Sequence, residues 1–107
     1  MKKSDLTKAI EHHRKNEFKK AEKLYLKILK ERSTQAETLS NANANLGSLY
    51  YQLQNSDEAI IHLKKAIFLN PTHTNALNNL ALVYIRLDDN EQVIQTLNKV
   101  LALDPII

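Results

Sequence analysis

Two stretches of this sequence decide the fold, because the second repeats the pattern of the first. Residues 46–71 read LGSLYYQLQNSDEAIIHLKKAIFLNP, and residues 80–105 read LALVYIRLDDNEQVIQTLNKVLALDP. Leucine, tyrosine and proline recur at one constant spacing, at Leu46 and Leu80, Tyr50 and Tyr84, and Pro71 and Pro105. A period of about 34 residues is typical of an array of stacked units rather than of one globular core.

The spacing within each stretch predicts an all-α protein. Leu46, Leu49, Tyr50 and Leu53 follow the three-and-four spacing of an amphipathic helix. Pro71 ends the next helix, because the residue before a proline is biased away from helical geometry. The sequence therefore predicts antiparallel helices in three hairpins, at 4–15, 18–32, 35–53, 56–69, 72–87 and 90–103.

The first repeat is more degenerate than the other two. Ala21 lies further from Ala59 than Ala59 lies from Val93, and the difference is an insertion of four residues, which we place near 36–39. An insertion of about one helical turn keeps the apolar face in phase. Thr34 and Glu37 look like a capping box, and Thr72 like an N-cap. We expect a single domain over 1–107, with repeats at about 2–33, 40–73 and 74–107.

These residues resemble the tetratricopeptide repeat, whose pattern places Leu-Gly, Tyr, Ala, a large apolar residue and Pro at fixed offsets. The resemblance covers nearly the whole chain and implies a right-handed superhelical array of three helix-turn-helix repeats. Gly47, Ala81 and Ala9 are small where the paired helices should approach closely. The matching residues of the second and third repeats are Leu46-Gly47, Tyr50, Ala59, Leu63 and Pro71, then Leu80-Ala81, Tyr84, Val93, Leu97 and Pro105.

Composition excludes several classes of site. The chain has no cysteine and one glycine, so thiolate chemistry and a glycine-rich phosphate loop are absent. His12, His13, His62 and His73 have no metal-ligand spacing, and we interpret them as solvated or partly packed. We therefore expect no catalysis, no cofactor and no metal. Without an apolar run or a leader-like start, the chain is expected to be cytoplasmic, with no membrane partner.

Charge is distributed unevenly along the chain. Residues 1–33 carry 11 Lys or Arg and 5 Asp or Glu, whereas residues 34–107 carry 4 and 7. The lysines between Lys19 and Lys30 fall mainly on the outer side of one helix. No aromatic stacking platform and no arginine-rich stretch accompanies these lysines. We therefore interpret them as a solubilising face and expect no nucleic-acid partner.

Asparagines mark the candidate binding surface. Asn45 and Asn79 stand directly before the Leu-Gly and Leu-Ala steps, on the helices that line the concave face in the resembled family. This placement resembles the asparagine ladder of superhelical repeat proteins such as O-linked N-acetylglucosamine transferase, where amides bind the backbone of an extended peptide. Thr7 interrupts the ladder in the first repeat. The flanking candidates are Asn41, Ser48, Gln52, Asn75, Asn78 and Arg86.

A second groove type known in the family is a clamp of lysines, arginines and asparagines for terminal carboxylates. Asn45 fits that clamp. Asn75 and Asn79 stand where a lysine and an arginine would be wanted, and Leu6 and Ile10 replace a lysine and an asparagine. We therefore reject the clamp.

Two functional hypotheses follow from the sequence. The first is a non-catalytic scaffold that binds an extended peptide or protein segment in a concave groove. The alternative is the substrate-recruiting repeat portion of a larger enzyme such as a glycosyltransferase. The last helix, with Ile94, Leu97 and Leu101, has no polar capping helix after it in the sequence. We expect a homodimer to form through it.

Overall fold

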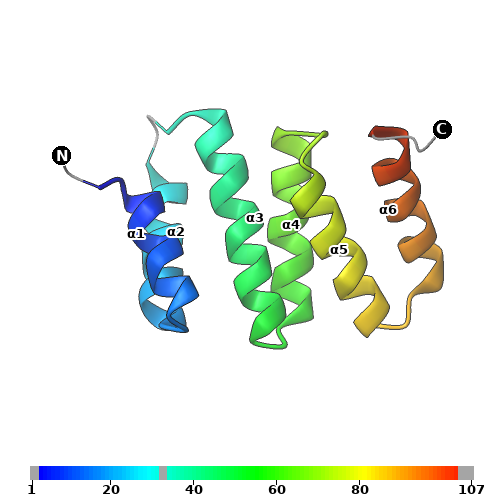
Figure 1. Cartoon of the computed structure of the whole chain (residues 1–107), viewed down its shortest axis with the longest axis horizontal. Helices are drawn as coiled ribbons and strands as arrows, with labels where there is room; N and C mark the ends of the chain where they lie inside the picture. Colours follow the sequence, from blue (N-terminus) through cyan, green and yellow to red (C-terminus); the bar gives the residue numbers. More distant parts are fainter. Residues whose placement is uncertain (1–2, 32–33, 104–107) are drawn as a thin grey trace.

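The structure, a computed structural model, describes residues 3–31 and 34–103. Every regular element in this part of the chain is an α-helix, and consecutive helices pair as antiparallel hairpins (Figure 1). The helices are α1 (Asp5–Arg14), α2 (Phe18–Lys30), α3 (Ala36–Gln52), α4 (Ser56–Leu69), α5 (Thr74–Arg86) and α6 (Asn90–Leu103). The predicted all-α array of three hairpins is confirmed, with helix ends within two residues of those expected.

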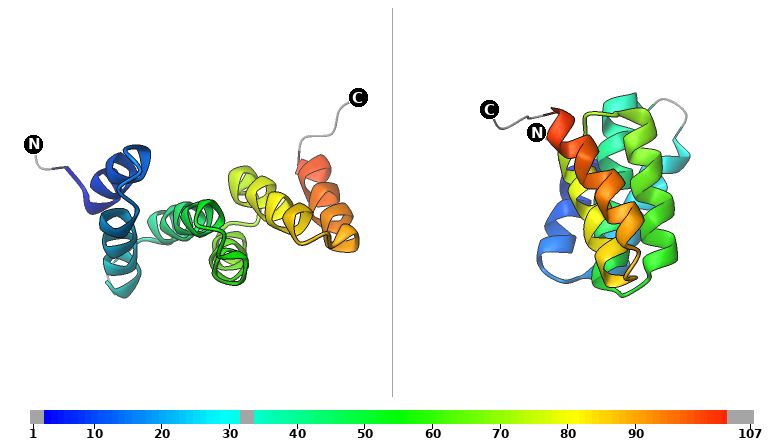
Figure 2. Two further views of the ribbon diagram at one scale, coloured as in Figure 1. Left: turned by 90° about the horizontal axis from the view of Figure 1, so that it is seen from below. Right: turned by 90° about the vertical axis from the view of Figure 1, so that its right-hand side faces the viewer.

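The hairpins stack into an α-α solenoid of 43 × 27 × 23 Å. Beyond the hairpin partners, α2 and α1 contact α3, and α4 and α3 contact α5. The first helices α1, α3 and α5 thus follow one another along one side of the array, and α2 and α4 lie on the other side (Figure 2). Each new hairpin covers apolar surface that the preceding one leaves open, as expected of a repeat array.

The three hairpins turn in the same way. Asn16, Gln54 and Asp88 have φ of 62°, 62° and 59°, the left-handed region that non-glycine residues seldom adopt. All three positions fall in the predicted turns. Asparagine and aspartate tolerate this conformation better than glutamine does, so Gln54 is the least favourable of the three.

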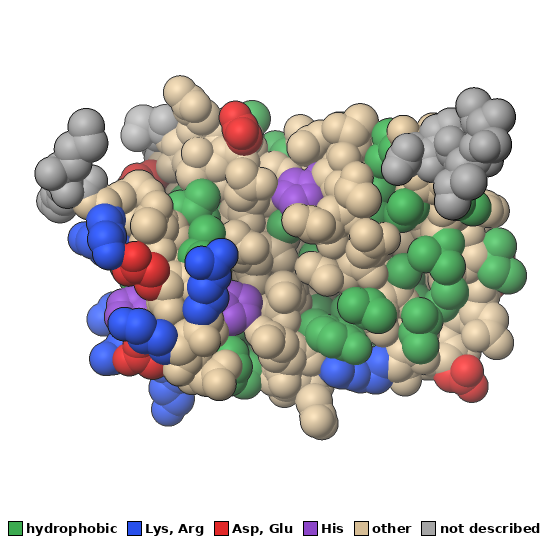
Figure 3. Space-filling view, in the orientation of Figure 1, with side chains coloured by type: hydrophobic (Ala, Val, Ile, Leu, Met, Phe, Trp, Pro, Cys, Tyr) green, Lys and Arg blue, Asp and Glu red, His purple; other side chains and the backbone are tan. Residues whose placement is uncertain are grey.

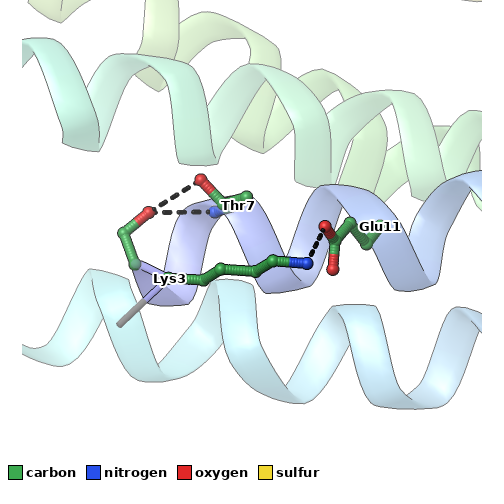
Figure 4. Close-up of polar contacts among 4 residues, drawn as sticks. Lys3, Thr7 and Glu11 are labelled. Atoms are coloured by element: carbon green, nitrogen blue, oxygen red, sulfur yellow. Dashed lines mark hydrogen bonds and ion pairs between the residues drawn. The ribbon is translucent and has the colours of Figure 1, made fainter. Parts of the chain in front are cut away.

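Polar side chains begin several helices. At the start of α1, the Ser4 hydroxyl accepts from the Thr7 backbone N–H at 3.1 Å, while Lys3 pairs with Glu11 at 2.7 Å (Figure 4). At the start of α4, Asn55 Oδ1 accepts from the Glu58 N–H at 3.3 Å. The bonds accepted by Ser4 and Asn55 satisfy backbone N–H groups that have no partner inside their own helix.

Two expected caps are wrong. Thr34 donates to the Ile28 carbonyl at 3.2 Å, and the N-cap of α3 is Gln35, which makes no side-chain cap bond. His73, rather than Thr72, caps α5, because its Nδ1 accepts from the Ala76 N–H at 3.2 Å. In both places the threonine hydroxyl bonds to a preceding residue instead, Thr34 to Ile28 and Thr72 to Asn70 Oδ1 at 2.8 Å.

The core confirms the close approach of paired helices. Ala9 and Ala81 are buried, and a Cβ added at Gly47 would lie 2.6 Å from Leu63 Cγ. Real Cβ atoms do not approach so closely, so this α3 position admits only glycine while Leu63 keeps its place. Across the same hairpin, the buried Ser40 hydroxyl donates to the Ala66 carbonyl at 2.9 Å.

Candidate functional site

A polar hollow of about 400 Å³ lies between the first and second repeats on the side of α1 and α3. Three of the predicted groove residues, Asn45, Ser48 and Gln52, line it from α3. They follow three-and-four spacing, which places them on one helical face. The opposite side is built from the first hairpin, by Ile10, His13, Arg14, Asn16 and Tyr25.

A hydrogen-bonded chain crosses this hollow. His13 Nδ1 lies 3.2 Å from the Tyr25 hydroxyl, and His13 Nε2 bonds to Gln52 Oε1. The imidazole packs edge-on against the rings of Phe18 and Tyr25, at 5.9 and 6.0 Å between centroids. His13, on α1, therefore contacts side chains of both α2 and α3.

The groups around the hollow are donors, acceptors and one permanent cation. Arg14 is exposed at its edge, and within the described residues no ion pair involves this guanidinium. Burial raises the pKa of Tyr25 to about 12, so its hydroxyl stays protonated near neutral pH. Burial, and then the bond that the Tyr50 hydroxyl donates to Glu22 at 2.7 Å, raise the pKa of Tyr50 as well.

Two other predicted residues are held by internal contacts. Asn41 Oδ1 lies 3.0 Å from His73 Nε2, which ties α3 to the start of α5. The Arg86 guanidinium stacks 3.7 Å over the Tyr51 ring and donates to the Tyr51 carbonyl. These side chains join the second and third repeats.

The remaining predicted residues lie on α5. Asn75 and Asn78 are exposed, and Asn79 is half-buried. None of the three lines the hollow that contains Asn45. The structure therefore gathers three of the eight predicted residues around one hollow and leaves the others along the same series of first helices.

The residues that sequence reasoning missed come from the first repeat. Arg14, Gln52 and Arg86 occupy equivalent positions of the three repeats once the inserted turn near 36–39 is allowed for. Because Gln52 and Arg86 were predicted as groove residues, this equivalence could have added Arg14 as a further candidate. His13 and Tyr25 carry no such signal, because their part in the hollow depends on how the first hairpin docks on α3.

One histidine was misinterpreted. His62 is buried at 7% exposure, and its Nδ1 lies 3.0 Å from Asn43 Oδ1. Asn43 Nδ2 also donates to the Leu39 carbonyl, so this asparagine belongs to the core rather than to a groove. Burial, and then the nearby charge of Lys65, lower the pKa of His62, while Glu58 opposes them.

Two kinds of feature are absent from the described residues, a cluster of metal ligands and a membrane-spanning helix. Residues 3–31 and 34–103 contain no group of three side chains arranged to hold a metal ion. Over the same residues, no helix has the length and apolarity that crossing a membrane requires.

Several solved structures share this fold. The chain aligns over 96% of its length with 80% of the first TPR of Spaghetti (RPAP3) bound to the HSP90 peptide SRMEEVD, at 19% identity and a TM-score of 0.83. The second TPR of the same protein, bound to the same peptide, gives 94% and 89% coverage, 17% identity and a TM-score of 0.82. The Hsp90 co-chaperone Cns1 of Saccharomyces cerevisiae gives a TM-score of 0.89 at 20% identity, over 96% of this chain and 33% of that one.

One of the two sequence comparisons identifies a family. No sequence among the curated proteins matches this chain. The sequence model of the tetratricopeptide repeat, however, matches residues 38–105, well over half of the chain. With its pattern residues, three hairpins and solenoid stacking, this chain belongs to the tetratricopeptide repeat family.

Proposed function

We propose that this protein is a non-catalytic scaffold that binds an extended peptide or protein segment along the concave face formed by α1, α3 and α5. One observation carries the proposal: Asn45, Ser48 and Gln52 line a hollow of about 400 Å³ together with Arg14 and His13. Amides carry donors and acceptors together, so they match a peptide backbone whatever its side chains are.

The similar structures support a peptide ligand without identifying it. Two of them hold an HSP90 peptide, but at 17–19% identity the similarity establishes the fold alone. Tetratricopeptide repeats are typically protein-binding modules, and the comparisons give no support to the enzyme-portion alternative.

In our proposal the ligand is recognised through its backbone. Asn75 and Asn79 are neutral where a carboxylate clamp would need cations, and the apolar Ile10 lines the hollow. A peptide ending in SRMEEVD should therefore bind weakly. Amidation of its C-terminus should make little difference. Tight binding that depends on the free carboxylate would contradict this expectation.

A peptide array identifies ligands, and paired variants then test the groove. We expect Asn45→Ala with Asn79→Ala to weaken binding by about 1 to 3 kcal/mol, the scale of lost hydrogen bonds. Asn98→Ala, an exposed asparagine on α6, is the matched control. Calorimetric titration measures affinity, and thermal melting should show little change. Unaltered affinity in the double variant would exclude the ladder.

We also propose that the chain forms a homodimer through α6. Ile94, Leu97 and Leu101 are 61%, 41% and 52% exposed. Hydrophobic side chains gather over α5 and α6 at the right of Figure 3, whereas basic ones lie over α1 and α2 at the left. An uncharged apolar patch can pair with its own copy around a two-fold axis.

Light scattering over a range of concentration and salt tests this dimer. Pairing of α6 with α6 should reach a plateau at two copies and should be insensitive to salt. A head-to-tail contact between the basic and acidic halves would instead keep growing with concentration and weaken in salt. A monomer at high concentration would exclude both arrangements.

The proposed location is the cytoplasm, without nucleic-acid or membrane partners. The absence of cysteine fits a reducing compartment. The lysines of α2 are partly neutralised, since Lys27 lies 3.3 Å from Asp5 and Lys20 lies 3.2 Å from Glu17. Cell fractionation and gel-shift assays with RNA and DNA measure these properties directly.

A further inference from the structure

Phe68 is the most exposed large hydrophobic side chain among the described residues, at 85%. It belongs to α4, a helix that lies on the side of the array opposite to the first helices (Figure 2). Two hollows meet at it and share Lys64 and Phe68. The ring therefore stands as a ridge between two depressions that the concave groove does not include.

One hollow is mainly apolar, whereas the other is lined by polar and apolar side chains in similar measure. One, of about 460 Å³, is lined by Phe68, Leu69, the two lysines Lys64 and Lys65, and Asn43, whose amide is already bonded inside the core. The other, of about 300 Å³, lies between α4 and α6 over α5. Its lining consists of Lys64, Ile67, Phe68, Leu80, Tyr84, Gln92, Gln95, Thr96 and Lys99.

The rim of both hollows is cationic. Lys64, Lys65 and Lys99 are exposed, and no ion pair within the described residues involves them. Neither hollow is lined by an aspartate or a glutamate. Residues 34–107 are acidic overall and contain 4 basic residues, the three lysines and Arg86. Three of the four basic residues of this acidic segment therefore gather around Phe68.

Stacking of the repeats does not require an aromatic residue here. Ala102 stands at the equivalent position of the third repeat, and Lys30 stands at that of the first. A single exposed apolar residue is ordinary on a protein surface. An exposed phenylalanine between an apolar hollow and a mixed one, with rim lysines that form no ion pair among the described residues, is the combination typical of a docking surface.

We propose that the Phe68 surface, made of the two hollows and their three lysines, binds an acidic amphipathic segment of a partner protein. Apolar side chains of that segment fill the hollows on either side of the ring. Its carboxylates pair with Lys64, Lys65 and Lys99. The proposal is independent of the concave groove, so the protein would hold two different polypeptides on opposite sides of the array.

The test uses a fluorescent peptide built from glutamate, leucine and phenylalanine with helical periodicity. A version with lysine in place of glutamate serves as the charge control. Resonances of α4 and α6 around Phe68 and Lys99 should shift on titration of the acidic peptide, while those of Asn45 and Ser48 stay in place. Binding should weaken as salt is raised.

Variants separate the contribution of the Phe68 ring to peptide affinity from that of the lysine charges. Phe68→Ala should reduce affinity about tenfold or more, as expected of an aromatic anchor, and Lys64→Glu with Lys65→Glu should abolish binding. Ile61→Ala, another exposed apolar residue of α4, and Lys23→Glu on α2 are the matched controls and should bind normally. Because Phe68 is so exposed, its variant should melt like the parent.

Several outcomes would overturn the proposal. They are equal binding of the lysine peptide, unchanged affinity of Phe68→Ala, or shifts confined to the concave groove. Loss of self-association in Phe68→Ala, without loss of peptide binding, would assign the surface to a second copy of the chain. Binding of anionic lipid vesicles in place of the peptide would assign it to a membrane.

Discussion

The second and third repeats share one sequence pattern but differ in burial. Leu63 of α4 is fully buried, whereas Leu97, at the equivalent position of α6, is 41% exposed. Ile60 packs against the core, whereas its equivalent Ile94 is 61% exposed. The difference arises because α5 covers α4, while among the described helices α6 contacts only α5. Equivalent positions can therefore carry the same kind of side chain, and the neighbouring repeat decides what that side chain contributes to stability.

The largest contrast should come from a buried charge. Ala59→Arg should lower the free energy of unfolding by about 4 kcal/mol, because it overpacks the α3–α4 contact and buries a cation. Val93 is the equivalent residue of α6 and is only partly buried, so the stem of an arginine there can reach solvent. In urea unfolding, Val93→Arg should lower the free energy of unfolding by less than half as much as Ala59→Arg does. Equal losses would show that α6 is as tightly enclosed as α4.

The next contrast is the removal of a leucine. Leu63→Ala should cost about 2 to 5 kcal/mol, as a cavity in a closed core does. Leu97→Ala should cost under about 1 kcal/mol, because much of its surface already meets water. Both values come from the same denaturant curves. A large loss at Leu97 would indicate that a second copy covers α6, and that loss should then grow with protein concentration.

A smaller contrast concerns the close approach of the helices. Gly47→Ala should destabilise by about 1 kcal/mol net, because overpacking outweighs the better helix propensity of alanine. The new Cβ would lie 2.6 Å from Leu63 Cγ and 3.3 Å from the Ala59 carbonyl. The third repeat already has Ala81 at this position. Thermal melting of Gly47→Ala shows whether the variant is less or more stable than the parent. A rise in melting temperature would mean that Leu63 moves aside freely.

The smallest contrast is a dependence on pH in the second repeat. The folded pKa of His62 lies below its ordinary value of 6.5, because burial disfavours the cation. The unfolded chain therefore binds the proton more readily, so this contribution is full above pH 6.5 and is lost progressively as the pH falls from that value through the lower folded pKa. The third repeat has Thr96 at the equivalent position and does not titrate there. Replacing His62 with Gln should flatten the fall in melting temperature between about pH 7.5 and 5.5. An unchanged profile would assign that fall to other groups.

The sequence by itself determined the helices and their pairing. Three-and-four spacing around Leu46 and Tyr50 and a proline stop at Pro71 are local signals, since each acts through the residue's own backbone or its own helix. The repeat pattern then predicted that neighbouring hairpins stack on one another. Asn45, Ser48 and Gln52 share one face of α3 because a helical face is set by spacing alone.

Only the tertiary structure decided which polar residues line the hollow and which bond to the rest of the protein. Asn41 and Asn45 stand four residues apart on α3, yet Asn41 bonds to His73 whereas Asn45 lines a hollow. Asn43 bonds to the buried His62, and Phe68 stands in solvent although most of its apolar neighbours are packed. Spacing gives the direction of a side chain from its own helix. Its partner depends on how the next hairpin docks, which is set by contacts between residues distant in sequence.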